Sequence, residues 1–292
     1  MAERTVARAR PLARPAWSWR RHGATVPRLA VAAVLSLFAV LPLVYMATTS
    51  FSPVGNILTV PPVLIPPHPT FVNYVEAWTD ASFSRYFFNS AYVTMGTIFL
   101  STLLSAVTAY GFASFEFRGK EAIFYFLLAS LAIPSVLMIM PQYLLMKTFG
   151  LINSRLGLIL LYSSASIPFN TFLLRSFFSG IPRELNEAMQ LDGVGEFAML
   201  WRLTLPLSLP ALATVGILGF NGAWDEFVLA VTLLNSPAKR TLPVALMVFQ
   251  GGHTTAWGPL FAASMIVTVP QIVVFAVAQR WFQEGISVSV PQ

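Results

Sequence analysis

The sequence predicts an all-α membrane protein with six transmembrane helices and one polar elbow between the fourth and the fifth. Two properties of the whole chain support this prediction. Of its 292 residues, 56% are hydrophobic and only 10% are charged, whereas soluble domains carry about 25% charged residues. The mean hydropathy is +0.68. Most of such a surface must face lipid or other helices.

Six apolar segments are long enough to cross a bilayer, which takes roughly 20 helical residues. Prolines fall in or beside several of them. A membrane helix tolerates proline where neighbouring helices satisfy the freed backbone groups, so the six helices are expected to form a bundle. The predicted spans are residues 29–50, 88–113, 122–144, 156–178, 207–234 and 260–281.

The distribution of Lys and Arg predicts the topology of the chain. Seven of the eighteen precede the first apolar segment. With the N-terminus in the cytoplasm, the inner segments hold thirteen and the outer segments five, as the positive-inside rule requires. Six crossings place the C-terminus and the elbow in the cytoplasm as well. The net charge of +6 is therefore interpreted as a topology signal in a multi-pass protein of the cell membrane, and not as a nucleic-acid surface.

Three regions follow from this reading of the chain. Residues 1–28 form a basic N-terminal cytoplasmic tail, expected to lie near anionic headgroups and not to be a cleaved signal peptide. Residues 29–285 form the six-helix domain. Residues 286–292 form a short C-terminal tail.

The elbow, residues 181–206, concentrates charges between two long apolar runs. Pro182 suits the first position of a helix, where its missing N–H costs nothing. Leu185, Ala188 and Met189 recur at a helical interval and share one face. The first half of the elbow is therefore predicted to be a short amphipathic helix.

The second half of the elbow is predicted to be another such helix. Gly193 separates the halves, because glycine accepts a positive φ that other residues resist. Phe197, Leu200 and Trp201 are expected to form an apolar stripe. Pro206 is expected to end the helix before the fifth span.

Two interpretations of the elbow remain open on this pattern alone. It is either an interfacial helix resting on headgroups or a surface that a partner in the cytoplasm grips. An anionic membrane surface would not attract its acids, and its glycine and proline positions are more specific than a lipid-resting helix requires. The four acids are Glu184, Glu187, Asp192 and Glu196.

The elbow resembles the EAA motif of permease subunits in binding-protein-dependent ABC importers. That motif reads E-A-A, three residues, G, nine residues, I, one residue, L-P. The spacing agrees throughout, with Met189 in place of the third alanine and Leu203 in place of the isoleucine. The residues that carry the resemblance are Glu187, Ala188, Met189, Asp192, Gly193, Leu203, Leu205 and Pro206.

Other stretches resemble the carbohydrate-uptake branch of that family, and its smaller maltose-type permease in particular. The resemblance extends over about residues 29–285. These stretches are residues 89–90, 109–113, 117–120, 224–227 and 251–258.

The resemblance implies the type I ABC importer permease fold, with the elbow as the coupling helix that docks into a cytoplasmic ATPase. The residue matching Glu187 pairs there with a basic residue, and the residue matching Gly193 makes the bend. The ATPase-coupling residues implied are Glu187, Ala188, Met189, Asp192, Gly193, Phe197, Leu205 and Pro206.

The resemblance also implies the partners of the chain in the lipid bilayer. They are a second, different permease, two ATPase subunits and an external substrate-binding protein. ATP and Mg would bind to the ATPase subunits, and no cofactor or metal is expected on this chain. The implied solute is a sugar or sugar derivative, which the sequence does not name.

A possible solute path is indicated by Asp225 and Glu226, which lie inside an apolar run. Charges at membrane depth are costly and face an interior or a cavity. If one straight helix continues from Pro206, nineteen residues place Asp225 about 28 Å further on. The acids either bond to a neighbouring span or form part of a polar lining for a hydroxylated solute, with Trp224 as a stacking surface. The candidate residues are Asn221, Trp224, Asp225, Glu226, Asn170 and Tyr162.

An enzyme is not expected. The chain has no cysteine, its three histidines are far apart, and it lacks the zinc-protease, serine-hydrolase and phosphate-loop motifs. Without a phosphate loop, ATP hydrolysis must come from another subunit. The alternative function is a secondary transporter driven by an ion gradient, which intramembrane acids would serve, but no inverted repeat is visible.

Overall fold

The computed structural model describes residues 25–53, 65–79, 82–250 and 255–287. The predicted N-terminal tail up to residue 24 and the last five residues of the predicted C-terminal tail lie outside the described residues. So does the first half, residues 251–254, of the stretch 251–258.

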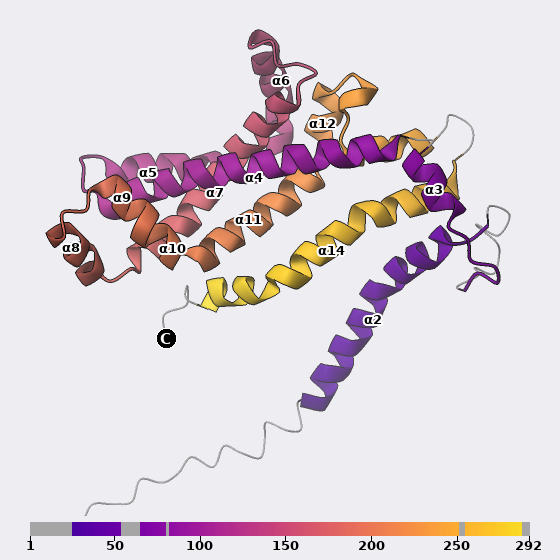
Figure 1. Cartoon of the computed structure of the whole chain (residues 1–292), viewed down its shortest axis with the longest axis horizontal. Helices are drawn as coiled ribbons and strands as arrows, with labels where there is room; N and C mark the ends of the chain where they lie inside the picture. The colour runs from indigo at the N-terminus through magenta and orange to yellow at the C-terminus, as the bar shows by residue number, and fades with distance from the viewer. Residues whose placement is uncertain (1–24, 54–64, 80–81, 251–254, 288–292) are drawn as a thin grey trace, which may run out of the picture.

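Helices dominate the described residues, whose β-structure is one isolated bridge between Gln250 and Thr255. The elbow helices lie at one end of the bundle, and α3 lies at the other (Figure 1). The α-helices are α2 (Thr25–Ser50), α3 (Val72–Thr79), α4 (Phe83–Ser114), α5 (Lys120–Ala129), α6 (Ile139–Thr148), α7 (Arg155–Ser179), α8 (Arg183–Leu191), α9 (Glu196–Met199), α10 (Leu205–Leu207), α11 (Leu209–Trp224), α12 (Val228–Leu233), α13 (Leu242–Ala245) and α14 (Trp257–Ser287).

Four of the six predicted spans are single helices long and apolar enough to cross a membrane: α2, α4, α7 and α14. The all-helical membrane fold is thereby confirmed. The first of these begins at Thr25, earlier than predicted. It lies at the edge of the bundle beside α14 (Figure 1). Its side chains from residue 27 to 44 are exposed.

The third predicted span, 122–144, is not one straight helix. Its two parts, Lys120–Ala132 and Ser135–Thr148, meet at 93°. Ile133 has an extended backbone, as expected for a residue that precedes a proline. Pro134 therefore divides this segment into α5 and α6.

The fifth predicted span, 207–234, also differs from one continuous helix. The axis bends by 80° between Leu207 and Leu209, where Pro210 cannot donate the N–H that would continue the elbow helix. The helix α11 then ends at Trp224, and α12 begins at Val228. The expectation that Asp225 lies about 28 Å along a straight helix from Pro206 is therefore wrong.

The bundle is organised around the contact between α4 and α7, which run side by side over most of their length. Small residues make the approach close. A Cβ on Gly96 would lie 2.7 Å from the Ile159 side chain. The same interface buries hydroxyl residues on both helices, as in many membrane bundles. They include Ser90, Thr94, Thr97, Ser101 and Ser105 of α4 and Ser163 and Thr171 of α7.

Gly157, in the first turn of α7, provides a test of close packing between that helix and the loop that precedes it. Its Cβ would lie 2.7 Å from the carbonyl oxygen of Leu151, and backbone cannot yield as a side-chain tip can. We expect Gly157→Ala to lower the free energy of unfolding by about 1–3 kcal/mol, measured by thermal unfolding of the purified protein in detergent. The control is Gly111→Ala on α4, where the part of the chain that the structure describes has no atom within 4 Å of the added methyl. Equal effects of the two changes would contradict the packing argument.

Candidate functional site

The first half of the elbow is α8, an amphipathic helix with no buried residue. It ends in a Schellman motif at Gly193, which has a φ of +76°. The Gly193 N–H donates to the Gln190 carbonyl and the Val194 N–H to the Met189 carbonyl, both at 3.0 Å. The left-handed conformation at Gly193 permits both bonds. Glycine is therefore the residue that lets the chain turn back toward the bundle.

The surface of α8 is acidic and exposed. Glu184, Glu187 and the adjoining Asp192 are exposed. Within the part of the chain that the structure describes, the ion pairs are Lys120–Glu116 and Arg175–Glu121. The three elbow carboxylates thus have no cationic partner there, so the surface can accept one from outside.

The second half of the elbow, which follows Gly193, attaches the elbow to the bundle, and we call it the root. Met199 and Leu200 are buried. Leu200 packs in a cluster with Ala109 of α4 and Leu174 of α7, and Leu205 packs against that cluster. Side-chain packing thereby connects the elbow to two transmembrane helices.

The predicted stripe of Phe197, Leu200 and Trp201 is wrong in part. Leu200 alone enters the core, while Phe197 is 73% exposed and pairs edge-to-face with Trp201. The Phe197 and Trp201 rings share a face that lies outside the cluster that Leu200 enters, and a π-helical turn over Leu200–Thr204 follows. Pro206 lies inside α10, and the helix ends one residue later.

A hydrogen bond also joins the elbow to α4. The Tyr110 hydroxyl donates to the Glu196 carboxylate over 2.8 Å, and Tyr110 is itself buried. Glu196, one of the four predicted acids of the elbow, is thus bound to a transmembrane helix and is not available to a partner in the same way as the acids of α8.

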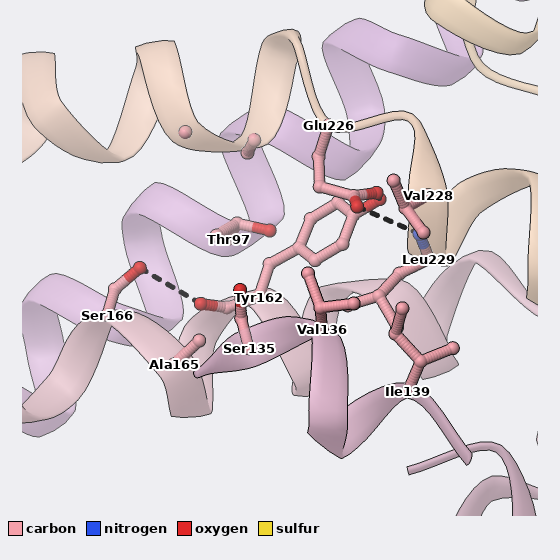
Figure 2. Close-up of a pocket in the computed structure, with 12 residues that line it drawn as sticks. Thr97, Ser135, Val136, Ile139, Tyr162, Ala165, Ser166, Glu226, Val228 and Leu229 are labelled. Carbon is pink, nitrogen blue, oxygen red and sulfur yellow. Dashed lines mark hydrogen bonds between the residues drawn. The ribbon is translucent and has the colours of Figure 1, made fainter. Parts of the chain in front are cut away.

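A hollow of about 300 Å³ lies where α4 and α7 meet the two interrupted segments. Figure 2 shows the Tyr162 ring directed toward Glu226, with Thr97, Ser135 and Ser166 around them. The hollow therefore combines apolar walls with a small number of polar groups, which is the usual composition of a small-molecule site.

The Glu226 carboxylate is the best-bonded polar group of this hollow. It accepts hydrogen bonds from the Tyr162 hydroxyl and from the N–H groups of Leu229, at 2.8 Å, and Ala230, at 3.1 Å. It thus caps the N-terminus of α12, whose first N–H groups have no partner within the helix. The prediction of a bond to a neighbouring span is confirmed for Glu226.

The other predicted path residues do not line this hollow. Trp224 is 3% exposed, donates its indole N–H to the Val267 carbonyl over 3.0 Å and stacks on Phe220. Asp225 accepts a hydrogen bond from Gln271 of α14. Asn170 is buried, and its side-chain amide has no acceptor among the described residues, whereas Asn221 is exposed.

Sequence reasoning missed Thr97 and the residues of the α5–α6 bend, Ser135, Val136 and Ile139, which also line the hollow. Pro134 is the signal that could have identified the bend, since a proline in the middle of a span is a possible interruption.

Comparison with known proteins places this geometry in context. The family described as binding-protein-dependent transport system inner membrane component matches residues 101–288. The diacetylchitobiose uptake system permease protein NgcG of Streptomyces coelicolor is 36% identical over 278 residues, covering 94% of this chain and 91% of the relative. The sulfoquinovosyl glycerol transport system permease protein SmoH of Agrobacterium fabrum is 33% identical over 261 residues, covering 89% and 91%.

A solved structure shares the fold. One chain in the crystal structure of a bacterial ABC transporter involved in the import of the acidic polysaccharide alginate has a TM-score of 0.81 at 22% identity. The match covers 92% of this chain and 100% of that chain. A second structure, of the bacterial alginate ABC transporter in complex with alginate pentasaccharide-bound periplasmic protein, has a TM-score of 0.67 at 15% identity, covering 89% and 93%.

The turn at Gly193 can be tested without changing a described contact, because no atom of the described residues lies within 4 Å of an added Cβ there. Left-handed backbone costs other residues about 1–2 kcal/mol. In Gly193→Ala, we expect the amides of residues 189–194 to exchange hydrogen about 5–30 times faster, measured by mass spectrometry of the purified protein. The control is Gly195→Ala, at a φ of −72°. Similar exchange in both variants would show that the left-handed turn does not hold the elbow.

Proposed function

Because the chain belongs to the family of inner-membrane components of binding-protein-dependent transport systems, and is therefore a transport subunit and not an enzyme, we propose that it moves a sugar or sugar derivative into the cell. The observation that carries this proposal is the exposed acidic helix α8, turned at Gly193 and rooted in the bundle by Leu200. Such a helix serves a membrane subunit that receives force from a partner in the water.

The solute class follows from the relatives. Their names refer to diacetylchitobiose, to sulfoquinovosyl glycerol and to galactooligosaccharides. These solutes differ in size and charge, but each contains a sugar ring. This shared sugar ring supports a sugar or sugar derivative as the solute of this chain, without selecting one.

The coupling route is the second part of the proposal. An ATPase subunit grips α8, with a cation of that subunit against Glu187, and ATP and Mg bind on that partner. Its motion reaches α4, α7 and α11 through the packing of Leu200 and through the Tyr110–Glu196 hydrogen bond. The ATPase-coupling residues predicted from the sequence then have two roles. Ala188, Met189 and Asp192, on α8 or at its end, contact the ATPase. Leu205 and Pro206, in the second half of the elbow, attach it to the bundle.

The assembly and topology complete the proposal. The chain works beside a second, different permease, with two ATPase subunits at the elbow and an external binding protein at the opposite end. Both termini lie in the cytoplasm, and the polypeptide crosses six times, with the third and fifth crossings interrupted. The positive-inside distribution of Lys and Arg supports this orientation.

The hollow at Tyr162 and Glu226 is proposed as part of the solute path. Interrupted membrane helices expose backbone only where it lines a cavity or is buried in protein, and two interruptions border this hollow. The ion-gradient alternative finds less support, because Glu226 is already held by three hydrogen bonds.

Charge reversal on α8 tests the coupling surface. We expect Glu187→Lys to lower the ATP hydrolysis stimulated by the external binding protein about tenfold or more, since it places like charges opposite each other at the contact. The measurement uses the whole complex in proteoliposomes. Glu184→Lys, on the same exposed helix but outside the predicted ATPase-coupling set, is the control and is expected to lower the stimulation less. The coupling role of Glu187 would be refuted by full stimulation in its variant.

Tyr162→Phe tests the solute path, because it removes one hydroxyl and leaves the packing volume nearly unchanged. We expect the solute concentration for half-maximal uptake to change about tenfold, the size of a lost hydrogen bond in a buried site. Tyr125→Phe, at a residue that is 64% exposed, is the control. An uptake curve that superimposes on the parent in both variants would exclude the hollow from the path.

A further inference from the structure

The segment 234–241, which joins α12 to α13, is held by side chains at the end of the bundle opposite the elbow. Asn89 of α4 is 3% exposed, and its amide donates to the carbonyls of Ala238, at 3.0 Å, and Arg240, at 2.8 Å. Its side-chain oxygen accepts from Arg155 of α7 at 2.7 Å. One buried amide thus connects α4, α7 and this segment.

Further bonds fix the two ends of the segment. The Ser90 hydroxyl accepts from the Leu242 N–H over 2.8 Å. The Asn153 side chain accepts from the Ser236 N–H over 3.0 Å. Although most of the segment is irregular, its backbone is positioned by several hydrogen bonds at once.

Three cations gather on this scaffold, and we call Arg155, Lys239 and Arg240 the basic patch. Arg155 bonds to the neutral Asn89 and lies 5.3 Å from the centre of the Tyr92 ring. Lys239 donates to the Asn153 carbonyl over 2.7 Å. The described residues form two ion pairs, and neither includes a cation of the basic patch. No carboxylate among the described residues is therefore within ion-pair distance of the patch.

Arg240 is the cation with the least satisfied side chain. Its Nε is buried and has no hydrogen-bond acceptor among the described residues. Arg240 borders a hollow of about 330 Å³ together with Asn235 and apolar side chains such as Val244 and Met247. Buried N–H groups normally have an acceptor, so this site lacks an oxygen atom that the described part of the chain does not supply.

We propose that the basic patch is a docking site for carboxylate side chains of the external solute-binding protein, with Arg240 as its central contact. This inference rests on the proposed function and orientation. A guanidinium binds a carboxylate through two parallel N–H···O bonds. A positioned scaffold lowers the entropy lost on docking, and its charge accelerates encounter with an acidic partner.

The location of the patch favours a protein over the phosphate of a lipid. The outer segments of the predicted topology hold only five of the eighteen Lys and Arg, and three of those five form the patch. They lie on or beside a connecting segment that α4 and α7 hold in place, and not along a helix face directed to lipid.

The experiment uses the whole complex in nanodiscs of phosphatidylcholine and measures binding of its cognate external protein at several salt concentrations. We expect Arg240→Gln to weaken binding about tenfold and to reduce the salt dependence, while ATP hydrolysis without the external protein stays unchanged. Arg240→Lys should retain part of the affinity. Arg118→Gln, at an exposed arginine near the elbow, is the control and should bind as the parent does.

The outcomes separate the inference from the function on which it rests. If the parent complex neither binds an external protein nor is stimulated by one, the proposed function fails. If the parent binds and Arg240→Gln binds equally well, the docking inference fails alone. If Arg240→Gln changes behaviour only in nanodiscs containing phosphatidylglycerol, the patch is a lipid-phosphate site, and the docking inference is again overturned.

Discussion

The close packing of α4 against α7 is the contact on which the other features depend. Glycine at position 96 and a row of buried hydroxyl residues let the two helices approach over most of their length. The elbow root packs on Ala109 and Leu174 at one end of the pair, and Asn89 bonds Arg155 at the other. Because tightly packed interiors transmit displacement and do not absorb it, motion at the elbow is expected to reach the far end through this pair.

The two interrupted segments explain why a carboxylate lies within an apolar run. Lipid offers no partner for backbone N–H groups, so a helix that begins inside the membrane needs its first donors bonded by protein. Glu226 does this for α12 and is itself held by Tyr162. The α5–α6 bend contributes Ser135 to the same hollow. The interruptions and the polar hollow are therefore one structural feature, and its acid is in the first place a helix cap.

Local patterns predicted the elbow well, and long-range packing decided what they missed. The turn at Gly193 follows from one residue whose backbone preference needs no tertiary context. Prolines show the limit: Pro42, Pro168 and Pro270 lie inside unbroken helices, whereas Pro134 divides a span. Whether a proline interrupts its helix depends on whether neighbouring groups satisfy the freed carbonyl. Hydropathy carries no information about those neighbours. The sequence likewise predicts Trp224 as a solute contact, because it does not reveal that the Val267 carbonyl accepts the indole N–H of Trp224.

Two sets of side chains at opposite ends of the bundle, the acids of α8 and the cations of the basic patch, have no ion-pair partner among the described residues. Exposed carboxylates of Glu184 and Glu187 stand on α8, whereas the cations of the basic patch bond only neutral groups of the described chain. Unpaired surface charge contributes little to stability, so folding alone does not account for the separation. It does affect association: a cationic group of a partner is attracted to the acids of α8, and an acidic group is attracted to the basic patch. Both sets of charges are held in place, the acids of α8 by the Schellman turn and the basic patch by the Asn89 bonds, so a partner that docks on either set loses less entropy in ordering it.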